Sequence, residues 1–169
     1  MAIELGEPPE VVGVPFTIRF AESEDLINWR LTSPRCVYSK DRYTACPTIR
    51  FLDDYYYMIY LEAKPGPAYE PHITRSRNLI QWQSSPFNPV MSFSADDKRI
   101  ANPELTAEQR ERIAGAVNVN NSDIDLCEFG GKTIIYYSWG NQQGTEFLAK
   151  AIYEGTLREF LHGFFPENG

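Results

Sequence analysis

Hydrophobic and polar residues alternate along much of this chain, as expected for strands that bury one face. In the segment NNSDIDL (120–126), Asp123 and Asp125 point to one side of a predicted strand and the apolar residues between and after them point to the other. The run YYYMIYLEA (55–63) is rich in the aromatic and β-branched residues that favour strands. The pattern therefore predicts an all-β protein.

Two signals repeat along the chain with nearly the same offset. The corner sequence SEDLINWRLTSP (23–34) matches SRNLIQWQSSP (76–86), and a weaker copy is EGTLREFLHGFFP (154–166). The hairpin ACPTIRFLDDYYYMIYLEA (45–63) lies over SDIDLCEFGGKTIIYYSWG (122–140) without a gap. A repeated unit of four antiparallel strands is typical of β-propeller blades.

We therefore expect one partial propeller domain over residues 1–169. Its predicted parts are the end of a blade at 17–35, a full blade at 44–91, a helical insertion at 92–117 and a second full blade at 118–166. Strands of the full blades are predicted at Cys46–Leu52, Tyr55–Glu62, His72–Arg77, Gln81–Ser84, Ser122–Phe129, Thr133–Trp139, Glu146–Tyr153 and Phe160–Phe165. Closed propellers have about four to eight blades, so the chain is expected to be the C-terminal half of a longer fold.

The insertion at 92–117 departs from the strand pattern. Thr106 is followed three residues later by Gln109, which is the sequence signature of a capping box at the start of a helix. In that helix Ile113 and Ala116 would face the body of the protein. The simplest role is a brace on the outside of the propeller.

Composition narrows the possible partners. The net charge of −7 argues against nucleic acid and anionic membranes and suits neutral ligands such as sugars. The three cysteines, Cys36, Cys46 and Cys127, are widely spaced, which fits reduced thiols in a cytoplasm rather than disulfides or a zinc site. No signal peptide, membrane span, metal motif or cofactor motif is visible.

The repeated corner and hairpin sequences resemble the five-bladed β-propeller glycoside hydrolases of the arabinanase and xylosidase kind (glycoside hydrolase family 43) over residues 17–166. The resemblance implies a central pocket with three acids at the mouths of inner strands: a general base, a general acid and an acid that tunes its partner. The base usually comes from the first blade, which is absent here. Some invertase-like relatives place an acid directly before a Cys-Pro pair, where this chain has Ala45 before Cys46. Both departures argue against hydrolysis by this chain alone.

Four residues are candidates for catalysis. Asp123 and Asp125 overlay non-acidic residues of the other blade, so they either line a sugar pocket or are, respectively, solvated and bonded to backbone. Glu62, at the end of an aromatic strand, is a candidate proton donor or a surface carboxylate. His72 is one of two histidines, and it either takes the place of a missing acid or is structural.

The candidates for substrate binding are Tyr43, Arg75, Trp139, Asn141 and Gln142. Amides and an indole suit sugar hydroxyls and ring faces, although turn formation explains the loop around Asn141 equally well. The repeated Trp29, Trp82 and Phe160 are expected in the core.

Two functions remain open. The first is a truncated or split relative of a propeller glycoside hydrolase that binds an oligosaccharide or glycoside. Asp123 or Asp125 would orient and tune the partner acid, Glu62 or His72 would donate the proton, and a partner chain would supply the base. The alternative is a non-catalytic carbohydrate-binding or scaffold module that self-assembles, with a homodimer closing the propeller.

Overall fold

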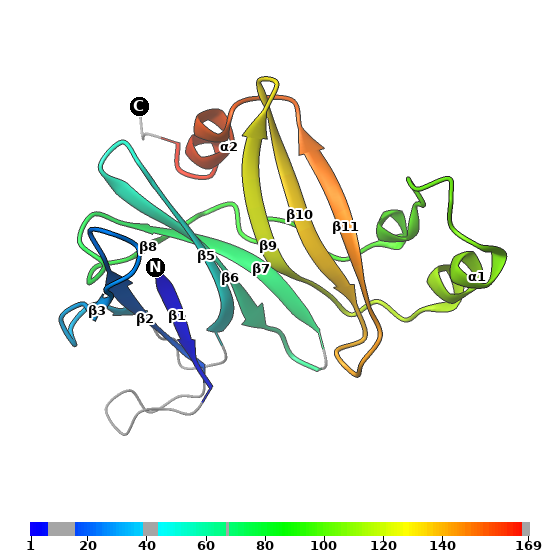
Figure 1. Cartoon of the computed structure of the whole chain (residues 1–169), viewed down its shortest axis with the longest axis horizontal. Helices are drawn as coiled ribbons and strands as arrows, with labels where there is room; N and C mark the ends of the chain where they lie inside the picture. Colours follow the sequence, from blue (N-terminus) through cyan, green and yellow to red (C-terminus); the bar gives the residue numbers. More distant parts are fainter. Residues whose placement is uncertain (7–15, 39–43, 67, 167–169) are drawn as a thin grey trace.

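The computed structural model describes residues 1–6, 16–38, 44–66 and 68–166 (Figure 1). The strands are β1 (Ala2–Leu5), β2 (Thr17–Glu22), β3 (Arg30–Leu31), β4 (Val37–Tyr38), β5 (Thr44–Leu52), β6 (Tyr55–Ala63), β7 (Tyr69–Ser76), β8 (Gln83–Ser84), β9 (Asn120–Phe129), β10 (Lys132–Gly140) and β11 (Glu146–Tyr153). The helices are the 3-10 turn η1 (Ala95–Lys98), α1 (Ala107–Gly115) and α2 (Leu157–Gly163). No helix in these ranges is long and apolar enough to cross a membrane.

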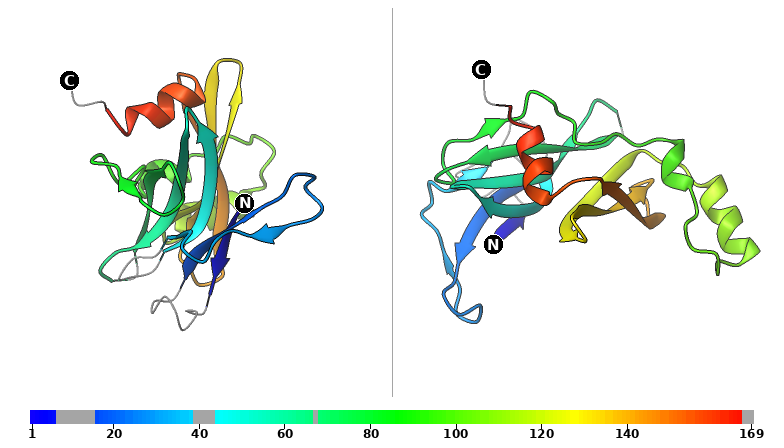
Figure 2. Two further views of the ribbon diagram at one scale, coloured as in Figure 1. Left: turned by 90° about the vertical axis from the view of Figure 1, so that its left-hand side faces the viewer. Right: turned by 90° about the horizontal axis from the view of Figure 1, so that it is seen from above.

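The strands form three successive groups, which we call the partial blade, the middle blade and the last blade (Figure 2). The partial blade is a sheet of order β1-β2-β3 with β4 paired to β2. A second sheet has the order β11-β10-β9-β7-β6-β5 with β8 paired to β7, and one parallel contact, Tyr69 opposite Asn120, joins its two halves. The middle blade is therefore β5–β8 and the last blade β9–β11. This arrangement confirms the all-β class and the partial propeller, whose sheet is not closed.

The last blade differs from the prediction at its end. The strand predicted at Phe160–Phe165 is wrong, because this part of the chain forms helix α2. Thr156 and Glu159 form a capping box in which each side chain accepts the other residue's backbone N–H, at 3.2 and 2.7 Å. Phe160 and Leu161 are buried on the core side of α2. The cap and the burial of these two residues favour helix over strand.

The helical insertion is confirmed. Thr106 and Gln109 form the capping box of α1, and Ile113 and Ala116 are partly buried against the main core. The helix lies beyond β11 at one end of the molecule (Figure 1).

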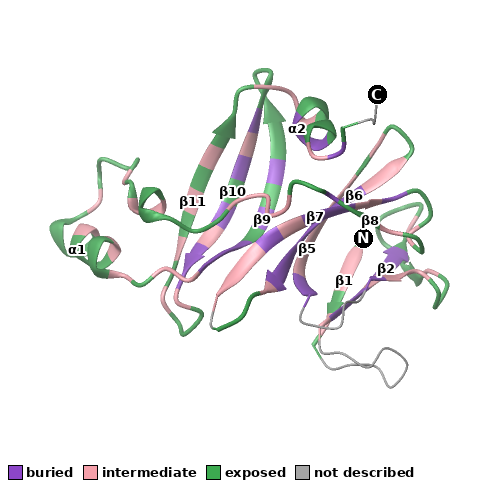
Figure 3. Ribbon diagram, turned by 180° about the vertical axis from the view of Figure 1, so that it is seen from behind, coloured by how far each residue is buried: buried purple, intermediate pink, exposed green. Residues whose placement is uncertain are grey.

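Blades pack face to face through the two sides of the middle blade. One side places Tyr57, Ile59 and Ile73 in a core that also contains Trp139 of the last blade. The other side contributes Met58 to a second core shared with the partial blade. Most residues of β6 are buried because both faces of the middle blade are covered, whereas buried and exposed residues alternate along β9 and β10 of the last blade (Figure 3).

The corner of the middle blade is partly buried against the preceding partial blade, whereas the corner of the partial blade is exposed. Trp82 of the middle blade stacks on Phe20 of the partial blade, with ring centroids 5.6 Å apart. At the corner of the partial blade, Leu26 and Trp29 are 77% and 42% exposed. The prediction that Trp29 lies in the core is therefore wrong for this chain, because no described residue covers that face.

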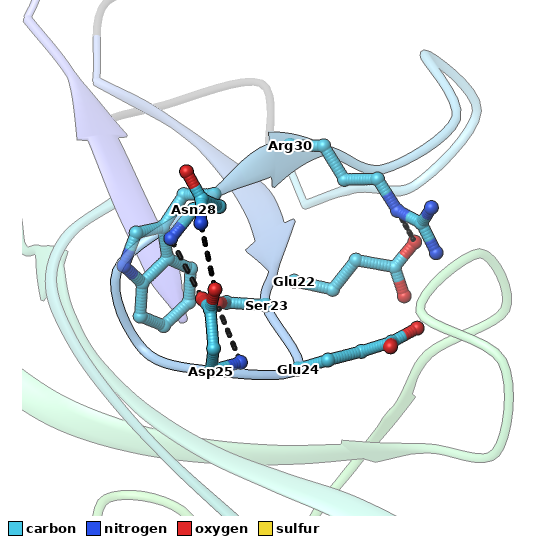
Figure 4. Close-up of a pocket in the computed structure, with 7 residues that line it drawn as sticks. Glu22, Ser23, Glu24, Asp25, Asn28 and Arg30 are labelled. Carbon is cyan, nitrogen blue, oxygen red and sulfur yellow. Dashed lines mark hydrogen bonds and ion pairs between the residues drawn. The ribbon is translucent and has the colours of Figure 1, made fainter.

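The exposed corner of the partial blade is held by its own hydrogen bonds (Figure 4). One carboxylate oxygen of Asp25 accepts the backbone N–H of Asn28 at 2.7 Å and that of Ile27 at 2.9 Å. The other accepts the side-chain amide of Asn28 at 2.7 Å. These bonds, led by the backbone N–H of Asn28, hold the pKa of Asp25 well below its ordinary value. The corner therefore keeps its shape without packing.

Candidate functional site

One end of the blades, which we call the mouth, gathers most of the candidate catalytic residues. It comprises the starts of β5, β7 and β9 and the end of β6, in the lower part of Figure 1. Thr44 of β5 lies opposite Glu62 of β6, and Tyr69 of β7 lies opposite Asn120 of β9. Three of the four predicted catalytic residues lie here: Glu62, His72 and Asp123.

Asp123 lies at a bulge near the start of β9. Its φ is +52°, and Cys46 at the equivalent position of β5 has a φ of +50°, where each strand also shifts register. Ser122 Oγ donates to the exposed Asp123 carboxylate at 2.8 Å. In turn, Nδ2 of the fully buried Asn120 donates to Ser122 Oγ at 3.0 Å. Two buried neighbours therefore orient an exposed carboxylate.

A second carboxylate, that of Glu4 in β1, approaches the same bulge. Glu4 Oε2 accepts the backbone N–H of Cys46 at 2.6 Å. Burial, and then the charges of Asp123 and Glu4, raise the pKa of the Cys46 thiol, which therefore stays protonated beside the two carboxylates. Carboxylates from the partial and last blades thus flank one residue of the middle blade. Sequence reasoning missed Glu4, and its only signal is an acid in the otherwise apolar strand AIEL.

Asp125 has a different environment from Asp123. It forms an ion pair with Arg50 of the middle blade and accepts the backbone N–H of Leu126 at 2.9 Å. Arg50 also donates to the Leu126 carbonyl oxygen at 2.7 Å. Burial by itself raises the pKa of Asp125. The hydrogen bond from the Leu126 N–H and the contacts with Arg50 together lower it by more, so the pKa lies below its ordinary value of 3.8. The Asp125–Arg50 ion pair therefore links the last blade to the middle blade.

Replacing Asp125 with asparagine is expected to reduce stability at neutral pH but not in acid. Because the pKa is depressed in the folded state, the carboxylate contributes stability above the unfolded-state pKa, and this contribution is lost as pH falls through the folded-state value. The effect is expected to stay below about 1 kcal/mol, since solvent screens a side chain that is 71% exposed. Urea unfolding of both proteins from pH 7 downward measures it. A difference that is constant at every pH would contradict the prediction.

Glu62, which is buried, and His72, which is partly buried, form a pair on neighbouring strands. Glu62 is 4% exposed, which excludes the alternative of a surface carboxylate. Its Oε2 lies 3.1 Å from His72 Nδ1 and accepts the hydroxyl of Tyr60 at 2.8 Å. Burial, and then the neighbouring Tyr38, raise the pKa of Tyr60, so its hydroxyl remains a donor.

On its other side, His72 faces a second carboxylate. His72 Nε2 lies 3.9 Å from Glu70 Oε2 and is buried without a hydrogen-bond partner among the described residues. Lys64 Nζ lies 3.0 Å from the same Glu70 oxygen. The imidazole therefore lies between two carboxylates, an arrangement that can hold or pass on a proton.

Arg75 lies at the end of β7 opposite the mouth. Its guanidinium carbon lies 4.4 Å from the ring centroid of Tyr55 and 4.5 Å from that of Phe165, and its Nε donates to Gln83 at 2.8 Å. These contacts occupy the side chain away from Glu62, His72 and Asp123.

The other predicted substrate-binding residues are mostly engaged within the last blade. Trp139 is 2% exposed and its ring centroid lies 4.7 Å from that of Phe147. The side-chain oxygen of Asn141 accepts two backbone N–H groups of its own turn, at 2.8 and 3.1 Å. Gln142 is exposed in that turn with a φ of +56°. Tyr43 lies outside the described residues. No group of three or more His, Cys, Asp or Glu within the described ranges is placed to hold a metal ion.

The fold of this chain is similar to that of solved glycoside hydrolases. It matches a protein described as a glycoside hydrolase with a TM-score of 0.56 and 14% identity, over 90% of this chain and 45% of the other. It matches a family 32 β-fructofuranosidase of Bombyx mori with a TM-score of 0.55 and 20% identity, over 93% and 31% of the two chains. A thermostable family 43 glycoside hydrolase gives a TM-score of 0.54 and 15% identity, over 82% and 43%.

These matches extend over only part of each relative. The chain spans less than half the length of the three proteins, with 45%, 31% and 43% of them covered. No protein-family model matches the sequence, and no curated protein matches it. At these identities the comparisons establish a shared propeller fold.

Proposed function

We propose that this chain is part of a propeller glycoside hydrolase and that its mouth binds an oligosaccharide or glycoside. The observation that carries the proposal is the pair of carboxylates, Glu4 and Asp123, that reach Cys46 from two different blades. Carboxylates in such a position can accept hydrogen bonds from sugar hydroxyls. The fold shared with three glycoside hydrolases supports the same function.

Hydrolysis is proposed only for a completed propeller. Glycosidases use two carboxyl groups on either side of the scissile bond, one as acid and one as base or nucleophile. Asp123 and Glu4 would contact the sugar, and the Glu62–His72 pair would hold the proton that reaches the glycosidic oxygen. The remaining carboxylate would come from further blades, beyond the partial, middle and last blades of this chain. Assignment of residues 1–169 to one domain is part of this proposal, as is a cytoplasmic location.

The test is sugar binding by the purified chain, measured by isothermal titration with sucrose and with aryl xylosides and arabinofuranosides. We expect weak binding of at least one of them. Asp123→Asn is expected to weaken it at least about tenfold, since a hydrogen bond to a charged group contributes roughly 1.5–3 kcal/mol. Glu24→Gln, an exposed acid of the partial blade, is the control and is expected to change nothing.

Two outcomes would overturn parts of the proposal. If none of these sugars binds, or if Asp123→Asn binds as the wild type does, the mouth is not the site. Rapid release of sugar from an aryl glycoside by the purified chain would show instead that no further blade is needed.

A second candidate function is a self-assembling carbohydrate-binding or scaffold module. It is favoured by exposed apolar side chains on both outer faces of the described blades. Leu26 and Ile27 are 77% and 81% exposed on the partial blade, and Leu148 and Ile152 are 75% and 49% exposed on the last blade. Such faces usually mark interaction surfaces. A homodimer would close the ring by joining the partial blade of one copy to the last blade of another.

A further inference from the structure

The outer edge of the third strand is covered in both earlier blades. In the middle blade, the Ser85 N–H donates to the Ile73 carbonyl oxygen of β7 at 3.1 Å. In the partial blade, the Thr32 N–H donates to the Phe20 carbonyl oxygen of β2 at 3.0 Å. In each case the chain that follows the Leu-x-x-Trp corner returns along the edge. An extended segment is therefore the regular partner of this edge.

The equivalent edge of the last blade, along β11, is open. Helix α2 takes the place of the returning segment, and within the described ranges no strand or backbone group pairs with the side of β11 that faces away from β10. A groove of about 790 Å³ lies there, lined by β11, by Tyr136, Tyr137 and Trp139 of β10, and by the insertion that contains η1 and α1. The consecutive residues 147–151, which point to both faces of the sheet, all line it. The groove therefore follows the backbone edge.

The register of β11 determines which backbone groups point into the open edge. The Asn141 N–H donates to the Thr145 carbonyl oxygen at 3.1 Å, and the pairing of β10 with β11 continues from there without a shift. Hydrogen-bonded pairs of an antiparallel ladder alternate, so the bonds to β10 fall on the odd-numbered residues of β11. The N–H and C=O groups of Glu146, Leu148 and Lys150 therefore point outward.

The side chains along this edge are self-complementary. Glu146, Leu148 and Lys150 share one face of β11, and Leu148 is 75% exposed. If a second β11 pairs antiparallel about a two-fold axis at Leu148, each Glu146 lies opposite a Lys150, and the two leucines face each other. An axis at Lys150 would oppose two lysines, and an axis at Ala149 would place Lys150 opposite Leu148. Opposite charges across a strand pair stabilise it and like charges destabilise it, so the charges select the first register.

We infer that β11 pairs with β11 of a second copy of this chain, antiparallel and centred on Leu148. The pairing continues the sheet from one copy into the other and gives the outward N–H and C=O groups partners that no described backbone group supplies. It uses the edge of the last blade, whereas closing the propeller would use its outer face. The inference therefore does not depend on sugar binding.

Sedimentation equilibrium on the full chain tests the inference. We expect a dimer for the wild type, and about a tenfold or greater rise in the dissociation constant for Lys150→Glu, because two attractive cross-strand pairs become repulsive. The double variant Glu146→Lys with Lys150→Glu restores both pairs and is expected to return the dissociation constant to within about threefold of the wild-type value. Glu24→Lys is the control for a change of exposed charge.

Two further variants keep the test decisive. Glu146 Oε1 accepts the Gln142 N–H at 2.9 Å, so circular dichroism must show that the double variant is folded. Leu148→Pro removes an outward N–H without removing a bond to β10, and it is expected to give a folded monomer. Ile27→Ser, on the partial blade, is expected to leave the dimer intact.

The inference is overturned by a wild-type chain that is monomeric at all concentrations up to about 100 μM, since roughly micromolar affinity is the least expected of a specific dimer. It is also overturned if Lys150→Glu dimerises like the wild type, or if the folded double variant dissociates like Lys150→Glu. A dimer that is lost in Ile27→Ser and kept in Leu148→Pro would point to closure of the propeller instead.

Discussion

Replacing Trp139 with alanine is expected to lower the free energy of unfolding by about 3–5 kcal/mol. The side chain is 2% exposed and packs on Phe147 in the core between the middle and last blades. Its removal leaves a cavity in this core, because close-packed neighbours relax only partly into the space. Chemical denaturation followed by circular dichroism measures the loss.

Trp29→Ala is the matched control for this prediction. Trp29 stands at the repeated corner but is 42% exposed, and its ring nitrogen donates to the Leu26 carbonyl oxygen at 3.1 Å. Its replacement is expected to cost less than about 1 kcal/mol, because little buried surface is lost. A Trp139→Ala protein with unchanged stability and reduced sugar binding would restore the interpretation of Trp139 as a sugar contact.

Replacing Glu62 with alanine is expected to destabilise the chain by about 2–5 kcal/mol, because two neighbouring hydrogen-bonding groups lose a partner at roughly 1–3 kcal/mol each. The Glu62 carboxylate is 4% exposed and contacts the His72 imidazole at 3.1 Å and the Tyr60 hydroxyl at 2.8 Å. Without it, the buried Tyr60 hydroxyl and the partly buried His72 imidazole each lose a hydrogen-bonding partner. Urea unfolding of Glu62→Ala measures the loss, and Glu24→Ala provides an exposed control.

A double-mutant cycle distinguishes the interaction between Glu62 and His72 from a simple loss of packing at each site. If Glu62 and His72 act together, the double replacement by alanine is expected to cost less than the sum of the two single replacements, with a coupling of about 0.5–3 kcal/mol. Additive losses would contradict the pairing and would leave each residue with a separate structural role.

The sequence predicted the strands of the middle blade well because their pattern is local. Alternation and the Asp53-Asp54 turn place the β5–β6 hairpin, and the structure extends β5 by only two residues, to Thr44. The end of the last blade was predicted less well. The corner repeat suggested a strand after Leu157, but the capping box of Thr156 and Glu159 starts a helix there. The cap was visible in the sequence and outweighs a weak repeat.

The candidate site could be predicted only in part. Alternation placed Asp123 and Asp125 on one face of β9, and the structure agrees that both are exposed. The two carboxylates have different surroundings. Asp125 forms an ion pair with Arg50 of the middle blade, whereas Asp123 lies beside Cys46, as Glu4 does. These partners lie far away along the chain, so no local pattern could identify them.

By itself, the sequence determined the strand character, the repeat and the capped helix, because periodicity, turn residues and caps act within a few residues of each other. Tertiary structure alone decided that Glu4 and Asp123 both lie beside Cys46 and that Glu62 is buried against His72. It also decided that Trp29 is exposed while Trp82 stacks on Phe20. Those outcomes depend on which blade lies beside which, and the packing of one blade on another follows from contacts that no single segment of the chain contains.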